Sequence, residues 1–82
     1  MTASFTMYTT SWCPYCYRLK AELAGTGIDY LEVDVDLDEQ AGQRVMELNG
    51  GNRTVPTLEF SDGSALTNPS VDEVTQKLAA LV

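Results

Sequence analysis

The sequence predicts an α/β fold in which a four-stranded mixed sheet is flanked by three helices, in the order β-α-β-α-β-β-α. Two patterns lead to this fold class. Short β-favouring runs alternate with helical periodicity over the first half of the chain, which implies parallel strands joined by a crossover helix. Further along, Asp62-Gly63 is a tight-turn signal between two more strands and implies an antiparallel hairpin at the sheet edge. A chain of 82 residues has the length of a single domain, expected to span 1–82.

The first strand and the first helix are predicted on either side of the two cysteines. Residues 4–9 favour a strand because they are rich in aromatic and β-branched side chains. Helical spacing begins after Cys13-Pro14, and Cys16, Leu19 and Leu23 recur on one face. Gly25-Thr26-Gly27 then predicts the end of this helix.

The second strand and helix have equally clear signals. Leu31, Val33 and Val35 alternate with acidic residues, which predicts a strand with one buried face. Asp38 is a plausible N-cap for the helix that follows. The expected inward stripe of that helix is Ala41, Val45 and Leu48, and its end is expected at Asn49-Gly50-Gly51-Asn52.

The C-terminal part predicts a hairpin followed by a helix. Residues 57–60 and 65–67 are the expected strands on either side of Asp62-Gly63. Ser70 and Glu73 have the spacing of a capping box, which predicts the start of the last helix. Its apolar stripe, expected to be core, consists of Val71, Val74, Leu78 and Leu81.

Composition removes several classes of function. With 5 Lys+Arg and 12 Asp+Glu, the net charge of −7 opposes binding to nucleic acid or to an anionic membrane surface. The absence of histidine excludes Ser-His-Asp triads, Cys-His pairs and zinc sites that contain histidine. No apolar run approaches the roughly 20 residues of a membrane span, and Met1-Thr2-Ala3-Ser4 lacks the basic start of a signal peptide. A soluble cytoplasmic domain is therefore expected.

The most informative motif is Cys13-Pro14-Tyr15-Cys16, at the junction of the first strand and the first helix. If Cys13 is the N-cap and Pro14 the first helical residue, the Cys13 sulfur faces free main-chain amides of Tyr15 and Cys16 at the positive end of the helix. These interactions favour the thiolate, which is the form that attacks disulfides. Cys16 lies on the apolar face and is expected to be more buried and less acidic. The motif thus predicts that Cys13 attacks and that Cys16 closes an internal disulfide which expels the bound partner.

Three other interpretations of the cysteine pair stay open at this point. The pair could form a structural disulfide, although so short a loop adds little constraint and cytosolic thiols stay reduced. It could be half of a zinc site shared by a dimer, because zinc needs four ligands. The two cysteines could also be ordinary core residues. Redox catalysis is favoured over all three.

A second motif, Thr54-Val55-Pro56, comes immediately before the third predicted strand. A proline there cannot donate to the sheet ladder, and its bond to Val55 is a candidate cis peptide. Alone this is a weak signal. Combined with Cys-Pro-x-Cys at a helix start in this order of elements, it becomes diagnostic.

Together these motifs resemble the glutaredoxin branch of the thioredoxin superfamily, and the resemblance covers nearly the whole chain. It implies the thioredoxin fold, with Cys13-Pro14-Tyr15-Cys16 as the active-site motif and Thr54-Val55-Pro56 as the cis-proline motif. Longer strings look more narrowly like mycoredoxins, the glutaredoxin-like enzymes that use mycothiol. Those strings are Thr9-Thr10-Ser11-Trp12-Cys13, Gly50-Gly51-Asn52-Arg53-Thr54-Val55-Pro56, Asp62-Gly63-Ser64 and Leu66-Thr67-Asn68-Pro69.

This resemblance implies a thiol-disulfide oxidoreductase that reduces mixed disulfides between proteins and mycothiol. Cys13 would take the mycothiol moiety and a second mycothiol would release it, while Cys16 could form the disulfide with Cys13. Pro14, Tyr15 and Pro56 would support the site, and Val55 would align the substrate backbone. The implied partners are mycothiol as co-substrate, mycothiolated client proteins and, indirectly, an NADPH-dependent mycothiol disulfide reductase. The protein is expected to be a monomer with no bound cofactor or metal and no nucleic-acid or membrane partner.

Departures from ordinary glutaredoxins point to the thiol that is used. Many glutaredoxins carry a lysine shortly before the first cysteine and an aspartate at the last helix start, which pair with charged groups of glutathione. This chain has Thr9 to Trp12 in the first place and Ser70 in the second. Mycothiol is a sugar conjugate without free carboxylates, so uncharged contacts suit it. The hypothesis is that Trp12, Tyr15, Thr67 and Asn68 line the sugar site, while Arg53 is equally a substrate contact or solvated surface.

Two rival functions remain. The first is a redoxin that donates electrons to ribonucleotide reductase and is recharged by thioredoxin reductase; such redoxins usually carry a Trp-Ser-Gly-Phe-type stretch where this chain has Leu66-Thr67-Asn68-Pro69. The second is an iron-sulfur carrier dimer bridged through Cys13. Carriers of that kind generally lack the motif proline, so Pro14 argues against this function.

Overall fold

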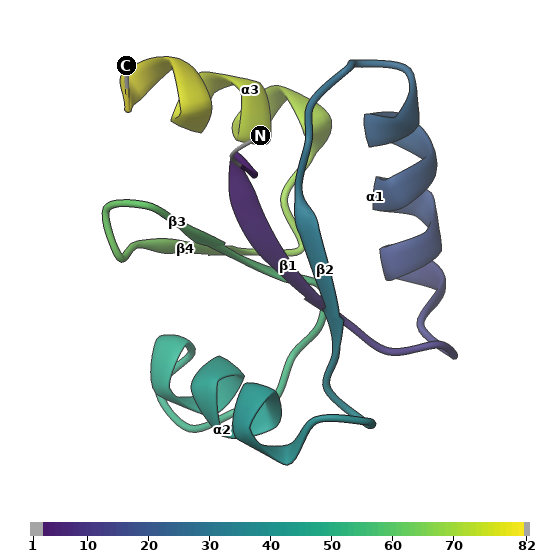
Figure 1. The fold of residues 1–82 in the computed structure, drawn as a ribbon, viewed down its shortest axis with the longest axis vertical. Coiled ribbons are helices and arrows are strands. Elements are labelled where there is room, and N and C mark those ends of the chain that lie inside the picture. Colours follow the sequence, from purple (N-terminus) through teal and green to yellow (C-terminus); the bar gives the residue numbers. More distant parts are fainter. Residues whose placement is uncertain (1–2, 82) are drawn as a thin grey trace.

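The computed structural model describes residues 3–81 and has the predicted α/β architecture (Figure 1). Met1, Thr2 and Val82 lie outside the described residues. All three belong to the domain expected over residues 1–82, and the first two belong to the segment in which no signal peptide was expected. The order of elements is β1 (Phe5–Thr9), α1 (Pro14–Ala24), β2 (Leu31–Asp34), α2 (Glu39–Leu48), β3 (Thr57–Phe60), β4 (Ala65–Thr67) and α3 (Val71–Ala80). This is the thioredoxin-like topology that the sequence predicts.

The four strands form one mixed sheet in the order β2-β1-β3-β4. β1 pairs in parallel with β2, with Tyr8 opposite Val33, because α1 crosses over between these two strands. β1 also pairs antiparallel with β3, and β3 pairs antiparallel with β4 across the turn at Asp62-Gly63. The carboxyl end of β1 and the start of β3 therefore meet at one end of the sheet.

Each face of the sheet has its own core. On one face, α1 and α3 pack together over the sheet (Figure 1), and the cluster there consists of Phe5, Met7, Leu19, Leu23, Leu58, Phe60 and Val74. On the other face, α2 covers a smaller cluster of Tyr8, Val35, Ala41 and Val45. Val71, Leu78 and Leu81 pack half-buried against the larger cluster, which confirms the predicted stripe of the last helix.

The expected buried face of the second strand is partly wrong. Val35 is buried, but it follows β2 rather than lying within it, and Leu31 is 56% exposed. Leu31 is aligned with Thr6 at the far end of the parallel pair. The small cluster under α2 forms around Tyr8, nearer the other end, so an apolar residue at Leu31 lacks a covering helix.

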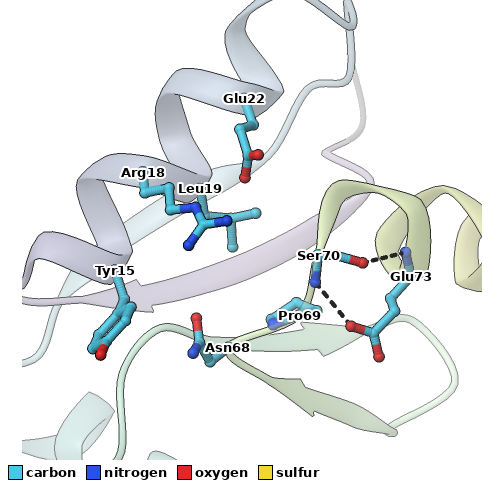
Figure 2. A pocket seen from close by; sticks show the side chains of 8 residues that line it. All are labelled: Tyr15, Arg18, Leu19, Glu22, Asn68, Pro69, Ser70 and Glu73. Carbon is cyan, nitrogen blue, oxygen red and sulfur yellow. Dashed lines mark hydrogen bonds between the residues drawn. The ribbon is translucent and has the colours of Figure 1, made fainter.

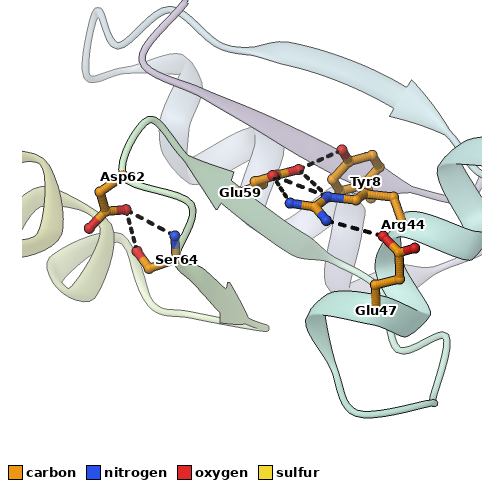
Figure 3. Close-up of polar contacts among 6 residues, drawn as sticks. All are labelled: Tyr8, Arg44, Glu47, Glu59, Asp62 and Ser64. Atoms are coloured by element: carbon orange, nitrogen blue, oxygen red, sulfur yellow. Dashed lines mark hydrogen bonds and ion pairs between the residues drawn. The ribbon is translucent and has the colours of Figure 1, made fainter.

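An ion-pair network ties α2 to the sheet (Figure 3). Arg44 donates to both carboxylate oxygens of Glu59 and also pairs with Glu47. The Tyr8 hydroxyl donates to Glu59 at 2.9 Å, while its ring packs in the smaller cluster under α2. Burial, the bond to Glu59 and the negative charge of that carboxylate raise the pKa of Tyr8 to about 12. At neutral pH Tyr8 therefore stays a hydrogen-bond donor.

Candidate active site

The structure places Cys13 at the start of α1, directly after the turn that follows β1. Cys13 is the N-cap with extended backbone (φ −87°, ψ 115°), and Pro14 takes the first helical position. The Cys16 main-chain N–H donates to the Cys13 sulfur at 3.4 Å. The predicted interaction with a free helical amide is thus present through Cys16, and the helix start supplies positive potential beside the sulfur.

Cys16 lies one turn further along, beneath the first cysteine. It is fully buried on the same face of α1 as Leu19 and Leu23. Burial, together with the neighbouring Cys13 thiol, raises the pKa of the Cys16 thiol to about 12, although a main-chain hydrogen bond from Thr10 and the charge of Lys20 act in the opposite direction. Both cysteines are free thiols. The chemistry of the pair is therefore asymmetric, with Cys16 held as a neutral thiol at neutral pH.

The proline motif reaches the sulfur from far along the chain. The Val55–Pro56 peptide bond is cis. The Cys13 thiol donates to the Val55 carbonyl at 3.7 Å, although the two residues are 42 positions apart. The Pro56 carbonyl accepts from the Asn68 amide at 2.8 Å, so the start of β3 and the end of β4 are joined beside the active site.

Two predicted substrate residues lie on the side of the site that faces α2. The Trp12 indole is 69% exposed, and its Nε1 donates to Asp36 in the loop after β2 at 2.8 Å. The Arg53 Nη2 atom donates to the Val35 carbonyl at 3.2 Å, and its guanidinium lies against Gly42 of α2. The aromatic ring before the nucleophile and the cation before the cis proline therefore both contact the β2–α2 segment.

Two other predicted residues line a groove on the opposite side, between α1 and the start of α3 (Figure 2). The groove has a volume of about 220 Å³. Tyr15, in the first turn of α1, stands at one end of the groove, and Asn68 closes the side formed by the β4–α3 loop. The remaining lining residues are Arg18, Leu19, Glu22, Pro69, Ser70 and Glu73.

The polar side chains of this groove differ in their hydrogen bonding. Ser70 and Glu73 are hydrogen-bonded to each other through the capping box at the start of α3. No hydrogen bond joins Tyr15, Arg18, Glu22 or Asn68 to another of the eight lining residues drawn in Figure 2. Arg18 and Glu22 were not among the predicted site residues. Their spacing from Tyr15, one and two helical turns, is the signal in the sequence that could have found them.

Thr67, the fourth residue of the predicted sugar site, is turned toward α2. Its hydroxyl donates to Asn49 Oδ1 at 2.8 Å, and Asn49 in turn donates to the Thr57 hydroxyl. Asn49 is the C-cap of α2, so this chain of bonds joins the helix end to the strands β3 and β4. The structure thus brings Tyr15 and Asn68 together and separates Trp12 and Thr67 from them.

Comparison with known proteins agrees with this geometry. The sequence pattern of the family described as Glutaredoxin matches residues 5–64, which include both cysteines and the cis proline. The chain belongs to the glutaredoxin family. It is a thiol-disulfide oxidoreductase with Cys13 and Cys16 as its active-site pair.

Several relatives match this glutaredoxin over nearly its whole length. A protein of Mycobacterium tuberculosis strain H37Rv, described as a glutaredoxin, is 56% identical over 81 residues, which cover 99% of this chain and 96% of the relative. Mycoredoxin 1 of Corynebacterium glutamicum is 48% identical over 79 residues, covering 96% and 98%. Among solved structures, a glutaredoxin from Methanosarcina mazei superimposes with a TM-score of 0.79 at 27% identity, over 93% of this chain and 78% of that one.

No helix in residues 3–81 of this glutaredoxin has both the length and the apolar character that crossing a membrane requires. Three of its aspartates, Asp34, Asp36 and Asp38, each accept a hydrogen bond. Asp34 accepts from the Asp36 amide, Asp36 accepts from Trp12, and Asp38 caps α2 by accepting from the Ala41 amide.

Proposed function

We propose that this glutaredoxin reduces mixed disulfides between proteins and mycothiol in the cytoplasm. The observation that carries the proposal is the groove beside Tyr15. At the start of α3, Ser70 has no charge to offer to a ligand, and the Glu73 carboxylate is bonded to the Ser70 amide. A ligand there meets hydroxyl and amide groups and the separate side chains of Arg18 and Glu22, whose opposite charges leave the lining of α1 without net charge. An uncharged, hydroxyl-rich sugar suits such a groove better than a charged tripeptide.

The reaction begins at the Cys13 thiolate. It attacks the mycothiol sulfur of the mixed disulfide, and the sulfur–sulfur bond between mycothiol and the client breaks. The client leaves as a thiolate that takes a proton from solvent. A second mycothiol thiolate then attacks the sulfur bound to Cys13, which releases mycothiol disulfide and restores the enzyme. An NADPH-dependent mycothiol disulfide reductase, acting on the released product, completes the cycle.

The two sides of the active site divide the substrate between them. The sugar part of mycothiol lies in the groove against Tyr15 and Asn68, with Arg18 and Glu22 as further contacts. The client polypeptide lies on the other side, along Val55 and between Trp12 and Arg53. Thr67 supports the groove through the β4–α3 connection, because its hydroxyl is already bonded to Asn49.

A second candidate function is favoured by the position of Cys16. Its amide is bonded to the Cys13 sulfur, so the second cysteine lies directly beside the first, as a pair that forms a disulfide must. A dithiol of this kind also suits a redoxin that donates electrons to ribonucleotide reductase. That function uses thioredoxin reductase as the source of electrons and requires both cysteines.

Turnover of a small mycothiol mixed disulfide separates the two functions. Mycothiol, glutathione or thioredoxin reductase would serve as the only reductant, with wild type, Cys13→Ser and Cys16→Ser compared. We expect turnover with mycothiol in wild type and Cys16→Ser, and none in Cys13→Ser. Turnover only with thioredoxin reductase, lost in Cys16→Ser, would replace the proposal with the ribonucleotide reductase donor. A visible absorption band in the purified protein would instead favour the iron-sulfur carrier.

The sugar groove has its own test. Asn68 has a positive φ of 47°, so Asn68→Gly removes the side chain without the backbone strain that alanine would add. We expect Asn68→Gly and Arg18→Gln each to raise the KM for the mycothiol substrate by about fivefold to tenfold with kcat unchanged, because each removes a ground-state contact. Gln76→Ala, an exposed polar residue of α3 outside the groove, is the matched control. An unchanged KM in both groove variants would contradict the assignment.

A further inference from the structure

Residues 49–56, the Val55 loop, join α2 to β3 and bring Val55 to the Cys13 sulfur. Thr57, the first residue of β3, is fully buried, and its hydroxyl donates to the Thr54 carbonyl at 2.7 Å. This bond ties the main chain just before Val55 to the main chain just after the following proline. It therefore limits the movement of the Val55 carbonyl, which accepts from the Cys13 thiol.

The Asn49 side chain determines which way the Thr57 hydroxyl points. Its Nδ2 donates to that hydroxyl at 2.9 Å, so the Thr57 oxygen is used as an acceptor and its proton is left for the Thr54 carbonyl. Its Oδ1 accepts from the Thr67 hydroxyl of β4 at 2.8 Å. The two polar atoms of the amide are thus bonded to two different strands, and this pair of bonds requires one donor and one acceptor on the same side chain.

We propose that Asn49 is a positioning residue for polypeptide disulfides, acting on Val55 through the Thr57 hydroxyl. The inference rests on the proposed function in one respect, the placement of the client along Val55. Without the amide donor the Thr57 hydroxyl is free to turn, its bond to Thr54 weakens, and the main chain at Val55 loses its fixed position beside Cys13. A disulfide without a polypeptide chain presents only its sulfur to Cys13, so its reaction does not depend on this position.

Two mixed disulfides of coloured thionitrobenzoate test the proposal by stopped flow, one formed with an uncharged cysteine-containing peptide and the other with mercaptoethanol. In the Cys16→Ser background, the Cys13 thiolate attacks the peptide or mercaptoethanol sulfur, the disulfide bond breaks, and thionitrobenzoate leaves with the electron pair. We expect Asn49→Asp, which keeps the acceptor for Thr67 and removes the donor, to lower the second-order rate constant for the peptide about fivefold to tenfold. The rate constant for the mercaptoethanol disulfide stays unchanged.

Three further variants separate positioning from charge and folding. Asn49→Ala removes the amide without adding a charge and should slow the peptide reaction to the same degree. Thr67→Val removes only the bond to the Asn49 oxygen, and combining it with Asn49→Ala should add no further loss, because both act through one network. Gln43→Ala, at an exposed position of α2, is the matched control and should leave both rate constants unchanged. Thermal unfolding of each variant verifies that it is folded.

Two results would overturn the role of Asn49. One is an unchanged rate constant for the peptide in Asn49→Ala, and the other is equal slowing with both disulfides, which would indicate a purely structural role. The Cys16→Ser parent should prefer the peptide, relative to the rates of both disulfides with a free thiol such as glutathione. No such preference would overturn the placement of the client, whereas a preference that survives Asn49→Ala would overturn the inference alone. Mycothiol is absent from the assay, so neither result depends on the thiol that serves as reductant.

Discussion

At the scale of single residues, Arg53 links the loop before the cis proline to α2. Its guanidinium bonds the Val35 carbonyl and occupies the space that a side chain on Gly42 would need. Glycine is costly inside a helix, and Gly42 is buried in the middle of α2. The contact with Arg53 explains why glycine stands at this position, because a larger side chain would overlap the guanidinium. The sequence suggested two roles for Arg53, substrate contact or solvated surface, and the structure adds this third, packing role.

A double-mutant cycle tests the contact between Arg53 and Gly42. In an Arg53→Ala background, Gly42→Ala should stabilise the protein by about 1 kcal/mol, because alanine is the better helix former. In wild type the same change should stabilise less or have no effect, since the guanidinium must move and the Val35 carbonyl loses its donor. The free energy of unfolding in urea gives the coupling, expected to be about 0.5–1 kcal/mol. Equal effects in the two backgrounds would show that the contact is energetically unimportant.

At the scale of elements, the start of α3 is fixed by a complete capping box. The Ser70 hydroxyl accepts from the Glu73 amide, and the Glu73 carboxylate accepts from the Ser70 amide. These two bonds satisfy amides that the helix itself cannot pair. They also set where α3 begins relative to Asn68, so the cap supports the groove as well as the helix.

Ser70→Ala should lower the free energy of unfolding by about 1 kcal/mol, because it removes one half of the box and leaves the Glu73 amide unpaired. Denaturant unfolding measures this directly. Ser61→Ala is a suitable control, since Ser61 is an exposed serine after β3 that takes no part in a cap; it should change stability by less than about 0.5 kcal/mol. Equal losses in the two variants would argue against a special contribution of the cap.

At the scale of the whole molecule, three cationic side chains form ion pairs with four of the acidic residues. Arg44 pairs with Glu59 and Glu47, Lys20 pairs with Glu32, and Lys77 pairs with Asp62. The hydrogen bonds from Arg44 and then Tyr8 outweigh burial and hold the pKa of Glu59 below its usual value. The pKa values of two other carboxyl groups, Glu32 and Asp62, are also lowered. Burial alone would raise the pKa of Glu32, but bonds from Lys20 and Thr9 lower it, and bonds from Ser64 and Lys77 lower the pKa of Asp62 to about 2.

These shifts predict how stability depends on pH. A carboxyl whose pKa is lower in the folded state stabilises the fold above its unfolded pKa, and this contribution is lost as the pH falls through the folded pKa. The free energy of unfolding should therefore decrease as the pH drops below about 4.5, the usual pKa of glutamate. Glu59→Gln should remove on the order of 1 kcal/mol of that decrease, because the neutral amide does not titrate.

The matched variant for this prediction is Arg44→Met. It removes the donor but keeps the carboxyl group, so the pKa of Glu59 is no longer held down and the acid-dependent decrease should again be smaller. Urea unfolding between pH 3 and pH 7 is the measurement for all three proteins. An unaltered pH profile in both variants would mean that the Arg44–Glu59 pair contributes little to stability.

The order and type of all seven elements followed from local signals in the sequence. Asp38 and Ser70 cap the helices that they were predicted to cap, because a capping side chain bonds amides only two or three residues away. Cys13 and Pro14 begin α1 for the same local reason. The cis peptide before β3 was also predicted, since Val55-Pro56 carries its own chemical signal at that place in the chain.

What the sequence alone determined was therefore the fold and the reactive pair, whose signals lie within a few neighbouring residues. Only the tertiary structure decided which distant side chains meet. It joined Trp12 to Asp36 and Thr67 to Asn49, opened the groove between Tyr15 and Asn68, and left Leu31 uncovered. Contacts of this kind depend on the path of the sheet and on how far each helix extends over it, and no local pattern of side chains encodes those distances.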